Sequence, residues 1–258
     1  MPSAEISRPS PDCIAASAGS IGRVSSIESS LNMVGENMHY SPGTDDCPLP
    51  FDPFKSCTVP RPIGWISTIS KNGHANLAPF SQWQNITYDP PIVMFSADQH
   101  VDGRKKDTVI NAEETGFFVW NMATYNLREA VNRSAQPVAR GVDEFELSGV
   151  SKAACIDAPG PRVAESPCQF ECHYLNTLRF PGTTRVSDAD VVFGQVVRIH
   201  IDDRFLLPNG KLDILRIRPL ARMGYYDYTS VTDVFEMRIP NADATEMAGL
   251  EGRPGRSR

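Results

Sequence analysis

Hydroxyl-bearing residues recur at positions where strands are predicted to run or end. Ser67, Thr68, Ser81 and Ser96 lie on or beside such strands, where packing alone would favour larger apolar side chains. Hydroxyl groups gathered at the rim of a sheet indicate a bound polar ligand, with a phosphate as one candidate.

A run of basic residues points to the same class of ligand. Arg104-Lys105-Lys106-Asp107-Thr108 opens a predicted helix, where free backbone N–H groups and the positive end of the helix dipole favour a dianion. Lys106 and Thr108 can add side-chain donors, whereas Asp107 is expected to cap the helix. The alternative interpretation is a solvated basic turn, in which Arg104 and Lys105 are exposed.

Cysteine spacing raises the question of a metal site. Cys168-x-x-x-Cys172-His173 resembles a ligand set, but on a strand His173 points away from the face that the two cysteines share. Ligands on opposite faces cannot converge on one ion, so no metal site is predicted. In a cytosolic chain of this size the cysteines are expected to be reduced, buried small hydrophobes: Cys13, Cys47, Cys57, Cys155, Cys168 and Cys172.

The elements that must position these residues begin between residues 60 and 97. A strand, the Asn72-Gly73 turn, a second strand, a polar loop and a third strand follow one another. Asn-Gly suits a type I′ hairpin because both central residues can take positive φ.

Further strands and short helices follow. Helices are expected over 107–114, capped by Asp107 and ended by Gly116, and over 126–133; residues 143–147 form either a turn of helix or an irregular segment. Strands are expected over 117–121, 169–175, 191–201 and 212–217, the last ended by Pro219. Strands dominate without βαβ alternation, so a closed antiparallel barrel with short helices is the economical arrangement, since closure removes exposed edges.

Bulk properties limit the function classes. The net charge of −6 argues against a nucleic-acid partner, and no apolar run is long enough to cross a bilayer. The first residues lack the pattern of a secretory leader, so cytoplasm is the default. Residues 1–45 are Ser-rich without periodicity and predict a disordered arm, residues 46–240 predict one folded domain, and residues 241–258 predict a flexible tail.

Several motifs in a fixed order carry a family resemblance. PRPIGWIST begins at Pro60, NLAPFS at Asn76 and DPPIVMFSA at Asp89, followed by RKKDT at Arg104, GFFVWN at Gly116 and PRVAESP at Pro161. This order resembles the flavin reductase-like family of FMN-binding split β-barrels, over residues about 50 to about 238. The resemblance implies a mainly β antiparallel split barrel of Greek-key type that binds FMN.

The resemblance also implies a function and a set of contacts. We expect an FMN-dependent oxidoreductase that accepts hydride from NADH or NADPH and forms a homodimer. The cofactor-binding residues are expected to be Ser67, Thr68, Asn76, Pro79, Phe80, Ser81, Trp83, Ser96, Lys106, Asp107 and Thr108. Ser67 and Thr68 point to opposite faces of one strand, so the sequence leaves open which of them faces the flavin. Phe80 is equally suited to the core.

Other aromatic and titratable residues receive weaker assignments. Trp83 is placed at the mouth of the pocket, and the tyrosines of the 224–228 segment form either a dimer contact or the wall on the nicotinamide side. No catalytic residue is assigned, because solvent can supply the proton that accompanies hydride transfer. The partner is either a monooxygenase that receives electrons or a dedicated organic substrate; a non-catalytic flavin carrier is the third possibility.

Overall fold

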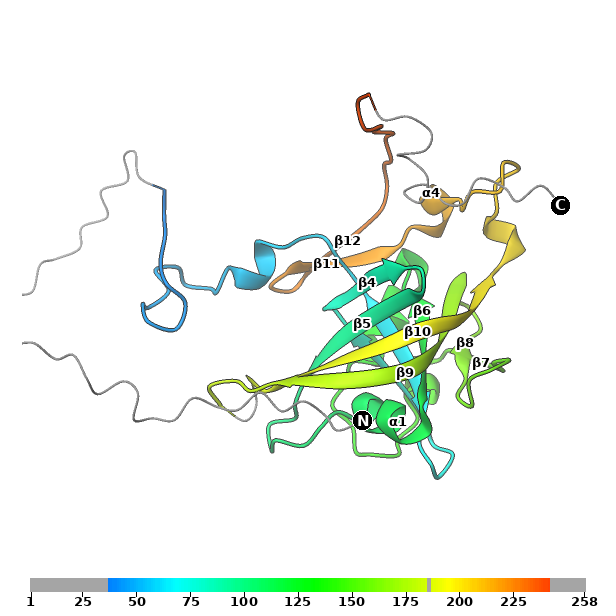
Figure 1. Cartoon of the computed structure of the whole chain (residues 1–258), viewed down its shortest axis with the longest axis horizontal. Coiled ribbons are helices and arrows are strands. Elements are labelled where there is room, and N and C mark those ends of the chain that lie inside the picture. Colours follow the sequence, from blue (N-terminus) through cyan, green and yellow to red (C-terminus); the bar gives the residue numbers. More distant parts are fainter. Residues whose placement is uncertain (1–36, 185–186, 242–258) are drawn as a thin grey trace, which may run out of the picture.

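The fold is built on one seven-stranded antiparallel sheet that coils into a barrel (Figure 1). The computed structural model describes residues 37–184 and 187–241. The order across the sheet is β3-β2-β6-β9-β10-β5-β4. The strands are β2 (Gly64–Ile69), β3 (Ala75–Phe80), β4 (Trp83–Tyr88), β5 (Pro91–Asp98), β6 (Phe117–Met122), β9 (Cys168–Phe180) and β10 (Ala189–Ile201). This arrangement confirms the predicted mainly β antiparallel barrel with short helices.

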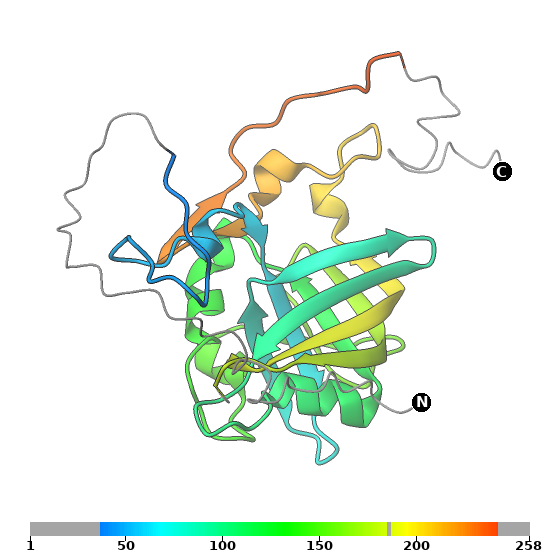
Figure 2. The ribbon, with the colours of Figure 1, turned by 60° about the vertical axis from the view of Figure 1, so that its left-hand side comes forward.

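Two features close the barrel. The edge strands β3 and β4 are consecutive in the chain, and the corner between them is fixed where the Ser96 amide donates to the Gln82 carbonyl at 2.9 Å. Helix α1 (Asp107–Thr115) crosses one end of the barrel and packs against β2, β3, β6 and β9 (Figure 2). Its Val109 and Ala112 side chains are fully buried in the barrel core, so α1 acts as a plug.

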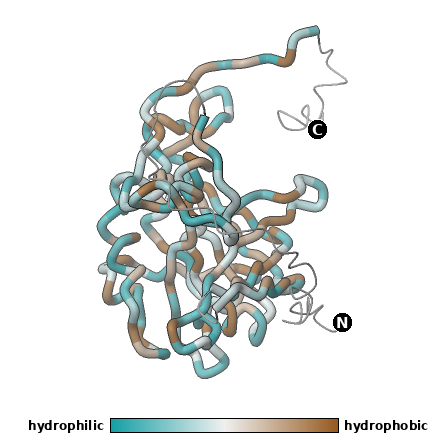
Figure 3. The backbone as a smooth tube through the Cα atoms, turned by 90° about the vertical axis from the view of Figure 1, so that its left-hand side faces the viewer, coloured by the Kyte–Doolittle hydropathy of each residue, from teal (hydrophilic) through white to brown (hydrophobic). Residues whose placement is uncertain are grey.

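A hydrophobic core lies on each side of β2. Inside the barrel, Ile66 packs with Phe95 and Phe118; outside it, Trp65 and Leu77 pack against two short helices. These are α2 (Arg128–Arg133), which follows a 3₁₀ turn over Tyr125–Leu127, and α3 (Glu144–Ser148). Hydrophobic and hydrophilic stretches accordingly alternate in short segments along the tube (Figure 3).

A three-stranded sheet lies beside the barrel, in the order β1-β11-β12 (Figure 2). Its strands are β1 (Arg61–Pro62), β11 (Leu220–Gly224) and β12 (Asp227–Ser230). Shorter elements are the 3₁₀ turns η2 (Phe54–Ser56) and η5 (Asp203–Phe205), helix α4 (Ile214–Ile217), and the pair β7 (Lys152–Ala153) and β8 (Arg162–Val163). In the described residues no helix is long and apolar enough to span a membrane.

Two local predictions in the first hairpins are wrong. Gly73 has a positive φ of 82° but Asn72 does not, and Gly73 donates to the Ser70 carbonyl while Ser70 donates to His74. This is a longer loop closed by a left-handed glycine, so the turn is not type I′. The predicted polar loop after β3 is strand β4, which pairs with β5 along its length.

Two further differences concern helices. Residues 212–217 do not form a strand: Asp213 accepts the Arg216 amide and caps the single turn α4. Residues 144–148 form a helix, one of the two predicted alternatives. Most of the predicted arm and tail, residues 1–36 and 242–258, lies outside the described residues, so the predicted domain limits stay predictions.

Candidate functional site

The N-terminus of α1 presents unpaired donors. The first intrahelical hydrogen bonds run from the Val109 and Ile110 amides to the Lys106 carbonyl, so the amides of Asp107 and Thr108 precede the helical ladder. No side chain of the described residues caps this end. Lys106, in extended backbone, occupies the N-cap position, and the prediction that Asp107 caps the helix is wrong. The geometry suits an anion at this helix end.

A buried polar network fixes this helix end against the sheet. The Asn76 amide nitrogen donates to the Thr108 hydroxyl at 2.9 Å, and the Asn111 amide nitrogen donates to the Thr68 hydroxyl at 3.1 Å. Thr68 and Asn76 stand directly opposite each other in the β2–β3 pair, and all four side chains are buried. Three predicted site residues, Thr68, Asn76 and Thr108, therefore meet at one place.

Ser67 lies on the opposite face of β2. Its hydroxyl donates to the Pro161 carbonyl at 2.7 Å and accepts from the Asn121 amide at 3.0 Å. Gly160 packs against the backbone of Thr68 so closely that an added Cβ would lie 3.3 Å from the Thr68 carbonyl carbon. Ser67 thus belongs to a brace behind the strand, and Thr68 faces α1.

An arginine that the sequence did not predict, Arg140, contacts two residues of α1 near its N-terminus. Arg140 donates to the Asp107 carboxylate at 2.8 Å and to the Asn111 amide oxygen at 3.3 Å. Its pairing neutralises the acid nearest to the free amides. Arg140, Asp107 and Asn111 line a cavity of about 280 Å³ together with Asn76 and His74. Because 33 residues separate Arg140 from Asp107, no local spacing could have revealed this pair.

A second basic side chain lies at the same helix end. The Lys106 ammonium is 3.5 Å from Nδ1 of His100. Burial, followed by the charges of Lys106 and Arg104, lowers the pKa of His100. The imidazole is therefore neutral at pH 7 and leaves the positive charge of Lys106 available. By contrast, Lys105 is held at 2.8 Å by both carboxylate oxygens of Glu113.

Strand β3 offers a backbone edge beside this helix. In the seven-stranded sheet it pairs only with β2, and the Leu77 amide on its free side donates to Glu144 at 3.1 Å. Burial raises the pKa of the Glu144 carboxyl, against the hydrogen bond from Leu77, which lowers it. Pro79 has no N–H to donate. Beyond Leu77 the free edge of β3 therefore offers backbone carbonyls as hydrogen-bond acceptors.

The remaining predicted residues lie around the corner after β3. The Ser81 hydroxyl contacts the Gln82 amide oxygen at 3.4 Å, and Ser96 is half-buried on β5. Phe80 packs on the core ring of Phe95, with centroids 5.0 Å apart. Trp83 is only 6% exposed and stacks in parallel on a second indole, Trp120, at 5.4 Å; this burial favours packing over a place at a pocket mouth.

The cysteines bear on the predicted redox state and on the prediction that no metal site is present. Cys168 and Cys172 are free thiols buried in the barrel core, as predicted. The prediction of burial is wrong for Cys57, which is exposed, and for Cys47 and Cys155, which are half-buried; Cys13 lies outside the described residues. Burial raises the pKa of the Cys168 thiol to about 11, and burial together with the nearby Glu171 charge raises that of Cys155 to about 12, so both thiols stay protonated at neutral pH. Among the described residues no group of three or more His, Cys, Asp and Glu side chains could hold a metal ion.

The sequence is similar to a known domain family and to proteins of other organisms. Residues 56–215 match the model of the flavin reductase like domain. An uncharacterized protein of Aquifex aeolicus is 35% identical over 170 residues, which span 65% of this chain and 84% of the relative.

Comparison of structures finds the same fold. Nitrilotriacetate monooxygenase component B from Bacillus cereus superposes with a TM-score of 0.72 at 24% identity, covering 79% of this chain and all of that one. The 2-nitrobenzoate 2-nitroreductase of Pseudomonas fluorescens superposes with a TM-score of 0.64 at 23% identity, covering 74% of this chain and 91% of that one. At these identities the likeness establishes the fold.

Proposed function

The chain belongs to the flavin reductase like domain family, and from this premise we propose that it is an FMN-dependent oxidoreductase that accepts hydride from NADH or NADPH. The observation that carries the proposal is the uncapped N-terminus of α1, where the Asp107 and Thr108 amides stand beside Lys106 and Arg140. A phosphate dianion suits this helix end, because two backbone N–H groups, the positive end of the helix dipole and the cations Lys106 and Arg140 lie there.

In this proposal each part of FMN has its own residues. Lys106, the Thr108 amide and Arg140 would hold the phosphate. Arg140 would then donate to the phosphate with part of the guanidinium that now contacts Asp107. From Asn76 to Phe80 the extended backbone of β3 covers about 13 Å at 3.3–3.4 Å per residue. This length lets backbone groups beside Pro79, and the hydroxyls of Ser81 and Ser96, follow the ribityl chain and the polar edge of the ring.

The protein's own contribution is position and electrostatics. Bound FMN supplies the chemistry by accepting hydride at its ring, while solvent supplies the proton. The buried network of Thr68, Asn76, Thr108 and Asn111 keeps α1 in a fixed place on the sheet, so that the phosphate anchor and the β3 edge stay in register. No side chain is required to act as an acid or base in this scheme.

The wider setting is also a proposal. We expect a cytoplasmic homodimer that handles small molecules and uses neither nucleic acid nor a membrane as partner. The net charge of −6 argues against nucleic acid as a partner. The similarity to a monooxygenase component B supports delivery of electrons to a partner monooxygenase, whereas the similarity to a nitroreductase favours a dedicated organic substrate as the second candidate.

A comparison of FMN with riboflavin tests the phosphate site. The dissociation constants of both flavins are measured by fluorescence quenching for the wild type and Lys106→Ala. Hydrogen bonds to charged groups contribute about 1.5–3 kcal/mol, so Lys106→Ala should weaken FMN about tenfold or more and leave riboflavin unchanged. Lys105→Ala is the matched control, because Glu113 already holds that ammonium. Equal loss for both flavins, or no loss for FMN, would refute the assignment.

A further inference from the structure

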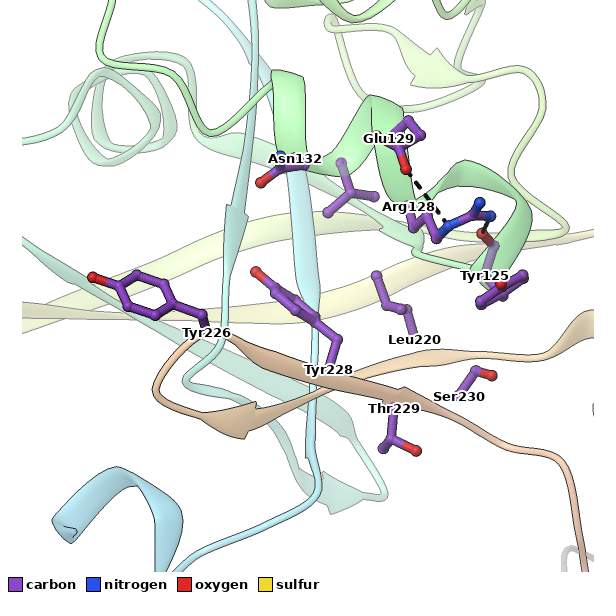
Figure 4. A pocket seen from close by; sticks show the side chains of 10 residues that line it. Tyr125, Arg128, Glu129, Asn132, Leu220, Tyr226, Tyr228, Thr229 and Ser230 are labelled. Carbon is purple, nitrogen blue, oxygen red and sulfur yellow. Dashed lines mark hydrogen bonds and ion pairs between the residues drawn. The ribbon is translucent and has the colours of Figure 1, made fainter. Parts of the chain in front are cut away.

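A second cavity lies between α2 and the β11–β12 hairpin, away from α1 (Figure 4). Its volume of about 520 Å³ falls within the range of small-molecule sites. Tyr226, Tyr228 and Ser230 of the hairpin face Arg128 and Asn132 of α2 across it (Figure 4). Leu220 and Val131 supply apolar surface. None of these residues lines the cavity at α1.

Arginine side chains are packed on the tyrosine rings here. The guanidinium carbons of Arg128 and Arg218 lie 4.2 and 4.0 Å from the ring centroid of Tyr125, and that of Arg222 lies 4.5 Å from the ring centroid of Tyr228. Such packing holds each guanidinium in a fixed plane with its N–H groups at the ring edge. The three cations are therefore pre-positioned.

The local charge is positive. Among the residues that line the cavity Glu129 is the one acid, and its ion pair with Arg128 is long, 3.6 Å, and solvent-exposed, so it is weak. With the neighbours Arg218, Arg222 and Asp227 included, three cations stand against two carboxylates. An anionic group is the complement that this imbalance favours.

Backbone conformation singles out the same place. Of the three non-glycine residues with positive φ in the described chain, Arg218 (φ 53°) precedes β11 and Tyr225 (φ 45°) forms the hairpin turn. Arg218 ends α4 at a position where glycine is the usual residue. A strained arginine there is understandable if its side chain is needed, and its side chain is the one on Tyr125.

Unsatisfied polar atoms gather here too. The buried side-chain atoms without a hydrogen-bond partner among the described residues are Ser56 Oγ, Arg61 Nε and Arg218 Nε. Ser56 packs against Gly224 of β11 and Arg61 pairs with β11 at Arg222, whereas Arg218 precedes that strand by two residues and stacks on Tyr125 in the cavity wall. Buried polar groups are usually hydrogen-bonded, so Arg218 Nε is a donor beside the cavity that a ligand can use.

We propose that this cavity is a binding site for a planar aromatic anion, a ring joined to a phosphate or carboxylate group. The rings of Tyr226 and Tyr228 and the apolar surface of Leu220 take the ring, and the guanidinium groups of Arg218 and Arg222 take the anion. The site is distinct from the cavity at α1 and does not depend on the assignment of FMN to it.

Four probes separate the two parts of the ligand. Binding to the full-length protein is measured by calorimetry for AMP, which has a ring and a phosphate, and for benzoate, which has a ring and a carboxylate. Adenosine, without the anion, and inorganic phosphate, without the ring, are the comparison compounds. We expect AMP or benzoate to bind at least about tenfold more tightly than both comparison compounds, and the preferred one identifies the anion.

Variants place the binding in this cavity. Arg222→Gln should weaken the preferred probe about tenfold, and Tyr226→Ser about three- to tenfold. Tyr226 is 93% exposed, so its removal leaves the fold intact. Arg204→Gln and Tyr88→Ser are matched controls on exposed side chains elsewhere and should change nothing. The proposal is wrong if neither AMP nor benzoate binds more tightly than the comparison compounds. It is also wrong if Arg222→Gln and Tyr226→Ser bind the preferred probe as tightly as their control variants do. A second copy of the chain that fills the cavity would give the first of these two results.

Discussion

Replacing Glu171 by glutamine should destabilise the protein strongly, because this carboxylate organises a loop from within. Glu171 is completely buried. One oxygen accepts the Ile156 amide at 2.8 Å and His200 Nε2 at 2.6 Å, and the other accepts the Asp157 and Ala158 amides, both at 2.6 Å. The loop then continues to Gly160 and Pro161, which brace β2 behind Thr68.

The size of the destabilisation follows from the N–H donors that lose their acceptor in Glu171→Gln. The glutamine amide nitrogen would face two N–H groups in place of an acceptor, and each unsatisfied buried donor costs about 1–3 kcal/mol. Glu171→Gln should therefore lower the free energy of unfolding by about 2–6 kcal/mol, measured by urea denaturation at pH 7. The control is Glu165→Gln, an exposed carboxylate that accepts the Ser151 amide; it should cost less than about 1 kcal/mol.

The same carboxylate predicts a pH dependence. Burial raises the pKa of Glu171, but the amides of the loop and His200 outweigh it and lower the pKa to about 2 from an ordinary 4.5. A lowered pKa in the folded state means that the stabilisation is present above about pH 4.5 and is lost as the pH falls toward 2. The shift corresponds to about 3 kcal/mol.

The difference in stability between the wild type and Glu171→Gln should accordingly shrink as the pH falls from 4.5 to 2. A difference that is constant over this range, or a Glu171→Gln protein as stable as Glu165→Gln at pH 7, would refute the account of the loop.

Two further predictions concern the site and the core. Arg140→Gln should weaken FMN about tenfold without affecting riboflavin, since hydrogen bonds to charged groups contribute about 1.5–3 kcal/mol; fluorescence titration checks this, and equal losses for both flavins would contradict it. Gly194→Ala should lower the free energy of unfolding by about 1–3 kcal/mol, because its Cβ would lie 2.4 Å from the ring of Phe118 and 3.2 Å from Cβ of Cys172. A wild-type urea midpoint for that variant would show that the barrel core is looser than described.

Much of the fold is predictable because local signals agree with the tertiary structure. The helix over 107–115 is ended by Gly116, whose φ of 76° supplies the left-handed C-cap that glycine favours. Strands β9 and β10 form where strands are predicted, over longer ranges, and α1 follows its basic run. In these places capping, turn chemistry and hydrophobic pattern indicate the same element.

The failures have physical reasons. Strand β4 has only its first residue, Trp83, buried, so Gln84 to Tyr88 show no alternation that would indicate a strand. Helix α4 is a single turn decided by the Asp213 cap, which β-branched and apolar neighbours such as Ile214 obscure. In both segments strand pairing or helix capping, and not the hydrophobic periodicity of the sequence, decides whether a strand or a helix forms.

The candidate site divides in the same way. Motif order predicts Thr68, Asn76 and Thr108 as site residues, and the structure brings their side chains together; their contact with a cofactor stays a prediction. Arg140 was missed because only the folding of a distant loop places it on Asp107. The packing of the 156–161 loop on Ser67, which leaves Thr68 on the side of α1, is also absent from any strand pattern.

The central claim is that this chain holds FMN and reduces it with a nicotinamide. The most direct test is the visible spectrum of the FMN-loaded protein before and after anaerobic addition of NADH or NADPH, with no third substrate. We predict rapid bleaching of the flavin absorbance by at least one of the two nicotinamides. A spectrum that stays yellow with both would contradict the proposed reductase and favour a flavin carrier or an enzyme that acts on its own organic substrate.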